Sequence, residues 1–141
     1  MEKETVLFLC TSNSCRSQMA EGLLRFIAAD RFEAFSAGAC ATSVHPLAIK
    51  VMKELGVDIS GQESKSVDSF AGRRFDYVIT VCGDAARDAC PVFSGEAGLG
   101  LVWSFDNPAE APGGKEERLA TFRRVRDQIK ARLEQFAEST D

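Results

Sequence analysis

The sequence has little of what metal centres and disulfide frameworks require. It contains one histidine, His45, and no two cysteines separated by two residues. Zinc centres are built from four Cys and His ligands at short spacings, so this chain offers poor material for one. Its five cysteines, at positions 10, 15, 40, 82 and 90, are an odd number. In a reducing compartment such thiols are fillers or catalysts rather than structural cross-links, and we expect no metal site.

Long apolar runs are also absent. No segment approaches the roughly 18 apolar residues that a membrane span needs. The first residues lack the basic and apolar regions of a signal peptide. The net charge of −4 and the pI of about 5.1 give no general attraction to nucleic acid or anionic lipid, so any anion site must be local. We expect a cytoplasmic protein that binds neither nucleic acid nor membrane.

The hydrophobic pattern that is present alternates between strands and helices. At 141 residues and 45% apolar composition, the chain fits a single domain over residues 1–141. Apolar runs typical of buried strands cover 5–9, 34–37, 77–81 and 99–103. Helical patterns cover 17–29, 46–55 and 115–137, and the first places Met19, Leu23, Phe26 and Ile27 on one stripe. This alternation predicts a three-layer α/β domain, with a parallel sheet between helices on both faces.

The segment from Cys10 to Ser17 directly follows the first strand and leads into a helix. In open parallel sheets, ligands bind beyond the carboxyl ends of the strands, where unpaired N–H groups of helix N-termini point at them. The small polar residues of this segment would let the backbone curl so that its N–H groups converge on an anion. These residues are Thr11, Ser12, Asn13 and Ser14, of which Asn13 tolerates a left-handed conformation.

Cys10 and Arg16 give this segment a reactive character. The guanidinium of Arg16 matches two oxygens of a tetrahedral oxyanion. The positive end of the helix and Arg16 both favour the thiolate form of Cys10, and the Ser17 hydroxyl can hydrogen-bond the sulfur. A buried strand-end cysteine before an ordinary helix is the alternative. Because the strand, the Cys-x5-Arg spacing, the serine and the helix occur together, we favour a nucleophile, with Cys15 mainly a packing residue.

Cys82 and Cys90 form a second group of thiols. Cys82 follows the 77–81 strand as Cys10 follows the first strand. If the two strands are neighbours, their ends lie about 4.8 Å apart, and a disulfide needs Cα atoms about 4.4–6.8 Å apart. Cys90 would lie about 12 Å from Cys82 along a helix, so a Cys82–Cys90 disulfide requires the segment to loop or unwind, with Gly83 as a hinge. Both cysteines could also be incidental, but we favour a redox pair.

The residues Cys10-Thr-Ser-Asn-Ser-Cys-Arg-Ser-Gln-Met-Ala-Glu21-Gly22 resemble the thioredoxin-coupled arsenate reductases of the low-molecular-weight protein tyrosine phosphatase superfamily. The resemblance extends over nearly the whole chain, including residues 36–38, 44–46 and 122–127. It implies a flavodoxin-like sheet with strand order 2-1-3-4, arsenate as substrate and thioredoxin as reductant. It also implies attack on arsenate by Cys10. Transfer of a disulfide through Cys82 and Cys90 would follow, with no metal or organic cofactor.

The chain departs from the superfamily at the general acid. Members carry Asp directly before Pro in the late loop, whereas Asn107 precedes Pro108 here. Asparagine cannot donate a proton as an acid does, and Asp106 could replace it if the loop shifts by one residue. The loss of the general acid before Pro108 would affect a phosphatase more than a reductase. We predict an arsenate reductase; the alternatives are a low-molecular-weight protein tyrosine phosphatase and a non-catalytic oxyanion-binding or redox-sensing module.

Overall fold

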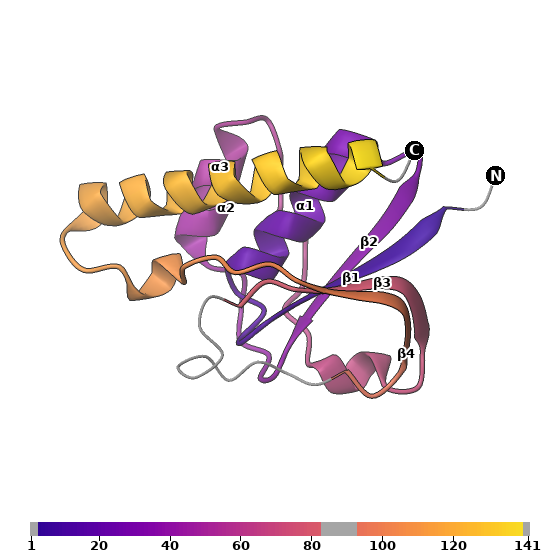
Figure 1. Cartoon of the computed structure of the whole chain (residues 1–141). Coiled ribbons are helices and arrows are strands. Elements are labelled where there is room, and N and C mark those ends of the chain that lie inside the picture. The colour runs from indigo at the N-terminus through magenta and orange to yellow at the C-terminus, as the bar shows by residue number, and fades with distance from the viewer. Residues whose placement is uncertain (1–2, 83–92, 140–141) are drawn as a thin grey trace.

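The centre of the molecule is a four-stranded parallel sheet (Figure 1). The computed structural model describes residues 3–82 and 93–139. Its strands are β1 (Glu4–Cys10), β2 (Phe32–Gly38), β3 (Arg74–Thr80) and β4 (Glu96–Val102). They are arranged in the order β2-β1-β3-β4, with every neighbouring pair parallel. The predicted α/β fold and strand order are confirmed.

Three α-helices lie over one face of this sheet (Figure 1). They are α1 (Arg16–Ala28), α2 (Pro46–Lys53) and α3 (Lys115–Ser139), and each begins and ends within two residues of the predicted helix. Within the described part of the chain, the helix on the other face is a short 3-10 helix, η1 (Val67–Phe70). A second 3-10 turn, η2 (Pro108–Glu110), interrupts the late loop. None of the helices in the described ranges has the length and apolarity needed to cross a membrane.

Alternate side chains of β1 enter two separate cores. Val6 and Phe8 pack beneath the three α-helices, whereas Leu7 and Leu9 face the side covered by η1. All four are fully or almost fully buried. A strand apolar at every position is stable only when both of its faces are covered, which explains the continuous apolar run at 5–9.

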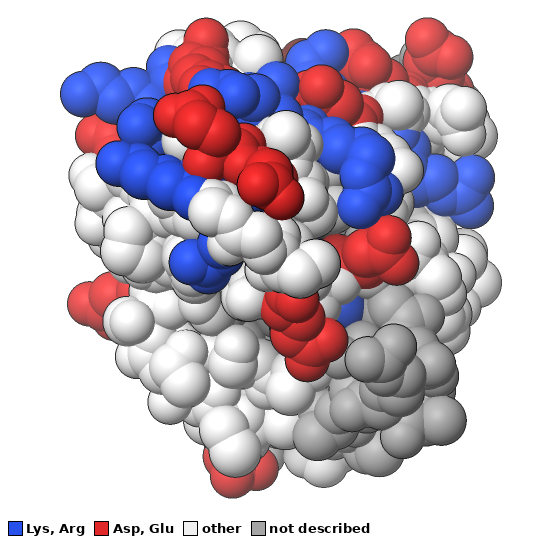
Figure 2. Space-filling view, turned by 90° about the vertical axis from the view of Figure 1, so that its left-hand side faces the viewer, with Lys and Arg blue, Asp and Glu red and all other residues white. Residues whose placement is uncertain are grey.

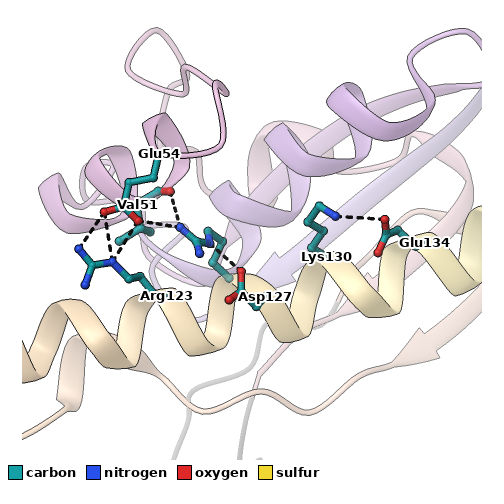
Figure 3. A network of polar contacts seen from close by, with 7 residues as sticks. Val51, Glu54, Arg123, Asp127, Lys130 and Glu134 are labelled. Atoms are coloured by element: carbon teal, nitrogen blue, oxygen red, sulfur yellow. Dashed lines mark hydrogen bonds and ion pairs between the residues drawn. The ribbon is translucent and has the colours of Figure 1, made fainter.

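Ion pairs join α3 to α2 (Figure 3). The buried Arg126 of α3 donates through Nη1 to the Val51 carbonyl and to Glu54 Oε1, both at 2.8 Å. Arg123 binds the same Glu54 carboxylate, with Nη2 2.9 Å from Oε2. One carboxylate at the end of α2 therefore fixes two successive turns of the long closing helix.

Two details of the sequence prediction were wrong. Phe26 is 57% exposed, because α1 turns Leu23 and Leu24 toward the core instead. The fourth strand is not buried: Leu99 is 50% and Val102 75% exposed. As an edge strand, β4 pairs only with β3 among the described strands.

Candidate active site

Cys10 is the last residue of β1, and α1 begins six residues later at Arg16. The thiol is buried, and its Sγ lies 2.8 Å from the Ser17 hydroxyl oxygen. The contact between Ser17 and the sulfur is therefore confirmed. The short segment between strand and helix brings the thiol to the first turn of α1.

Asn13 organises the curl of this segment. It is fully buried and adopts the left-handed conformation, with φ of 49°. Its Nδ2 donates to Ser17 Oγ at 2.7 Å, and its Oδ1 accepts from the Lys65 backbone N–H at 2.7 Å. Because Ser17 Oγ accepts this hydrogen bond, its own hydrogen is available to the Cys10 sulfur.

The carbonyl groups of the Cys10–Ser17 loop are bound to the surrounding scaffold. Five successive carbonyls accept hydrogen bonds, and each partner lies outside residues 10–17. The pairs are Thr11 with the N–H groups of Ala39 and Cys40, Ser12 with the hydroxyls of Thr42 and Ser64, Asn13 with the Gln18 amide, Ser14 with the His45 N–H and Cys15 with the Met19 N–H. The loop shape is therefore determined by contacts from four different parts of the chain.

Gly38, at the end of β2, lies against the back of the loop. It pairs in register with Cys10. A Cβ atom at this position would lie 2.5 Å from the Asn13 backbone nitrogen and 2.9 Å from the Ser12 carbonyl carbon. Only glycine permits this approach, because neither backbone atom can move without displacing the loop.

Arg16 connects the loop to the late segment. Its side chain is almost fully buried, and its Nη1 donates to the Phe105 carbonyl at 3.2 Å. The next residue, Asp106, has a side chain 74% exposed that forms an ion pair with Arg124 at 3.4 Å. Asn107 accepts a hydrogen bond from the Ala109 N–H and so caps η2. The structure thus brings the backbone beside Asp106 to Arg16, while the carboxylate itself points to α3.

Cys82 lies two residues beyond the end of β3, the strand next to β1. Leu9 of β1 is in register with Thr80 of β3, and the Val81 N–H donates to the Leu9 carbonyl at 2.8 Å. Cys82 therefore stands one residue beyond the position opposite Cys10, and its side chain is buried. No disulfide joins the four cysteines within the described ranges. Cys90 lies outside the described residues.

Cys15 in the loop and His45 beside it have structural roles. Burial raises the pKa of the Cys15 thiol to about 12, which agrees with its interpretation as a packing residue. His45 directly precedes α2 and caps it, because its Nδ1 accepts from the Leu47 N–H at 3.1 Å. Within the described part of the chain, no group of three His, Cys, Asp or Glu side chains could hold a metal ion.

Sequence reasoning missed Gln18 as part of the site. Its buried side-chain amide donates to the Asn13 carbonyl at 3.1 Å, to Asn13 Oδ1 at 3.0 Å and to the Glu63 carbonyl at 2.9 Å. From the sequence alone, a polar residue in the first turn of an amphipathic helix is expected to be solvent-exposed. Only the packing of the 63–65 segment over this turn buries it.

Residues 5–141 match the family model described as low molecular weight phosphotyrosine protein phosphatase. The chain belongs to this family. The arsenate reductase of Halalkalibacterium halodurans is 48% identical to it over 139 residues, covering 99% of both chains. An arsenate reductase solved in the phosphate-binding state superposes with a TM-score of 0.82 at 35% identity, over 98% of this chain and 99% of that one. The thioredoxin-dependent arsenate reductase of Corynebacterium glutamicum superposes with a TM-score of 0.67 at 30% identity, over 97% of this chain and 61% of that one.

Proposed function

We propose that this protein reduces arsenate to arsenite in the cytoplasm by a thiol relay, with thioredoxin as reductant. The observation that carries the proposal is the buried Cys10 thiol. It is hydrogen-bonded to Ser17 beside the buried Arg16, with a second thiol, Cys82, at the neighbouring strand end. The names of the relatives support arsenate as the substrate, and the one named thioredoxin-dependent supports the reductant.

The loop geometry supports a tetrahedral oxyanion as ligand. Because the carbonyls of residues 11–15 are bound outward, the N–H groups of the curl are left for an anion on its inner side. The residues that would bind it are Thr11, Ser12, Asn13, Ser14, Cys15, Arg16 and Ser17. Arg16 supplies the fixed positive charge, and the Ser17 hydrogen stabilises the Cys10 thiolate.

The proposed first step joins Cys10 to arsenic. The Cys10 thiolate attacks arsenate, and an oxygen leaves as hydroxide or water. Cys82 then attacks the Cys10 sulfur, so that a Cys10–Cys82 disulfide forms while the S–As bond breaks. The electron pair of that bond stays on arsenic, which leaves as arsenite. From the register, the Cα atoms of Cys10 and Cys82 are about 6 Å apart, within the range of about 4.4–6.8 Å for a disulfide.

In the proposed second half of the reaction, Cys90 attacks Cys82 and releases the Cys10 thiolate. Thioredoxin then reduces the Cys82–Cys90 disulfide by the same exchange chemistry. These steps require no metal or organic cofactor, because the two electrons come from thiols.

The late loop favours a reductase over a phosphatase. The Asn107 amide oxygen is engaged in capping η2, and an amide cannot act as a general acid. Asp106 is the proposed proton source, and it would have to leave Arg124 to reach the site. If it supplies the proton, Asp106→Asn should lower kcat roughly 10²-fold or more. An Asp106→Asn enzyme with unchanged kcat would remove Asp106 from the mechanism.

The proposal is tested by arsenate turnover with thioredoxin, thioredoxin reductase and NADPH, beside hydrolysis of p-nitrophenyl phosphate. We expect arsenate-dependent NADPH oxidation and little phosphatase activity. Cys10→Ser should abolish both, while the far-UV circular dichroism stays unchanged.

Trapping tests the order of the relay. Cys90→Ser should accumulate a Cys10–Cys82 disulfide after one turnover, and Cys82→Ser should form none, as read by peptide mapping. A Cys10–Cys15 disulfide dominating in Cys90→Ser would contradict the relay. Wild-type protein that hydrolyses p-nitrophenyl phosphate but leaves arsenate unchanged would identify a phosphatase. Arsenate binding without any turnover would identify a sensing module.

A further inference from the structure

Arg118 is a cation that the mechanism above does not use. It lies in the first turn of α3 and is half-buried. None of the carboxylates in the described ranges forms an ion pair with it. Its neighbours on the helix are paired, Arg123 and Arg126 with Glu54 and Arg124 with Asp106. The positive charge of Arg118 is therefore not neutralised by any residue that the structure describes.

Helix α3 directs Arg118 toward the Cys10–Ser17 loop. Phe122, one turn later on the same face of the helix, packs against His45 with ring centroids 4.9 Å apart. The backbone N–H of His45 donates to the Ser14 carbonyl at 3.0 Å, so this face of α3 lies next to the loop.

The charge of Arg118 acts on two groups at the loop. Burial raises the pKa of the Cys15 thiol, and Arg118 is among the groups that oppose the rise. Burial also lowers the pKa of His45, and Arg118 adds to that lowering. Both effects place the guanidinium within electrostatic reach of the loop.

We propose that Arg118 is a second cation of the oxyanion site, which draws the tetrahedral dianion to the loop while Arg16 binds it inside. With a net charge of −4, the protein as a whole repels anions, so local cations must create the attraction. On the face drawn in Figure 2, basic side chains mix with acidic ones over the helices and form no broad basic patch. An unneutralised arginine beside the loop supplies a local field that mixed charges of this kind do not.

This role predicts an effect on binding rather than on chemistry. The attraction acts on the anion before and during the reaction alike, so its loss raises KM and leaves kcat nearly unchanged. One charge acting on a dianion across partly solvated space is worth roughly a three- to tenfold change in affinity. Salt screens such a field, so the difference between Arg118 and a neutral residue should shrink as ionic strength rises.

The test compares Arg118→Gln, Arg118→Lys and the matched control Arg132→Gln. The control removes the same charge from an exposed arginine of α3 that lies over Trp103, about 21 Å along the helix from Arg118. We expect Arg118→Gln to raise the KM for arsenate roughly three- to tenfold at low salt and less at high salt. Arg118→Lys should restore most of the affinity, and Arg132→Gln should match the wild type.

The inference rests on the proposed function only in naming arsenate, so phosphate binding is measured separately by titration calorimetry without turnover. A weaker phosphate affinity in Arg118→Gln supports the second cation even if the wild type fails to reduce arsenate. The proposal is overturned if Arg118→Gln binds phosphate and arsenate as the wild type does. It is equally overturned if kcat falls at constant KM, or if only the KM for thioredoxin rises. Far-UV circular dichroism and the midpoint of thermal unfolding show whether each variant is folded. If Arg118→Gln is not folded, the anion affinity of Arg118→Lys decides whether the positive charge at this position matters.

Discussion

At the scale of single residues, two cysteines five positions apart have different environments in one loop. Cys10 contacts the Ser17 hydroxyl, whose oxygen is already engaged by Asn13. Cys15 belongs to the apolar core beneath the α-helices, and burial raises the pKa of its thiol to about 12. The Sγ of Cys15 also contacts a hydroxyl, that of Ser14 at 3.8 Å, but this contact only partly offsets the effect of burial.

The buried Cys15 thiol should make the protein less stable in alkali. Its folded pKa of about 12 lies above the ordinary value of 9.0, so the fold favours the neutral thiol. The stability that this provides is complete below pH 9 and is lost as pH rises toward 12, because the unfolded chain ionises first. Urea unfolding measures the free energy of unfolding at about pH 8 and at about pH 10.5. Between these two pH values, Cys15→Ala should lose less of this free energy than the wild type does. Cys40→Ala removes an exposed thiol and is the control. Its free energy of unfolding should fall as much as that of the wild type between the two pH values.

At the scale of elements, the end of β2 shapes the loop through Gly38. We expect Gly38→Ala to lower arsenate reduction at least tenfold, because its Cβ would displace the backbone at Asn13 and Ser12. It should also cost about 1–3 kcal/mol of unfolding free energy. Gly100→Ala in β4 is the matched control, since a Cβ there meets nothing within 4 Å. Normal activity in Gly38→Ala would show that the loop does not depend on this contact.

The closing helix depends on Glu54. Glu54→Gln should destabilise the protein by about 1–3 kcal/mol, because Arg126, with a side chain only 9% exposed, loses the Glu54 carboxylate and is left with its ion pair to the exposed Asp127. Glu134→Gln, which breaks the more exposed Lys130–Glu134 pair along α3, should cost less than about 0.5 kcal/mol (Figure 3). Urea unfolding of both variants checks the difference. Equal effects would mean that the pair at Arg126 adds nothing beyond a surface contact.

The same carboxylate gives a pH dependence of opposite sign to that of Cys15. Hydrogen bonds and charges from Arg123 and Arg126 lower the pKa of Glu54 below its ordinary value of 4.5. The stability that this provides is present above that ordinary value and is lost as pH falls through the lower folded value. The difference in unfolding free energy between the wild type and Glu54→Gln should therefore become smaller at acidic pH.

At the scale of the whole molecule, two cores share one sheet. β1 contributes Val6 and Phe8 to one core and Leu7 and Leu9 to the other. Neither core can therefore unfold without disturbing the strand that supports the other core. We predict a single cooperative unfolding transition for one domain. Trp103, the only tryptophan, is buried against Phe136 of α3, so its fluorescence reports this packing. Its denaturation curve should coincide with that from far-UV circular dichroism, and two separate midpoints would contradict a single domain.

The sequence by itself determined the elements that depend on neighbouring residues. Continuous apolar runs and helical spacing located the sheet and the three α-helices, because both patterns arise within one segment. The link between Cys10 and Ser17 was also predictable, since one short loop between strand and helix carries both residues.

Tertiary structure decided the contacts between distant segments. Arg16 meets the Phe105 carbonyl across 89 residues of sequence, and Gln18 is buried by the 63–65 segment. The exposure of Phe26 and of β4 likewise follows from which neighbours cover α1 and the sheet edge. A local pattern records whether a side chain is apolar, but the register of the strands and the packing of the helices choose its partners. For that reason the sequence placed Cys10, Arg16 and Ser17 in one loop, while only the fold showed that Gly38 packs against this loop and that α3 brings the face with Arg118 next to it.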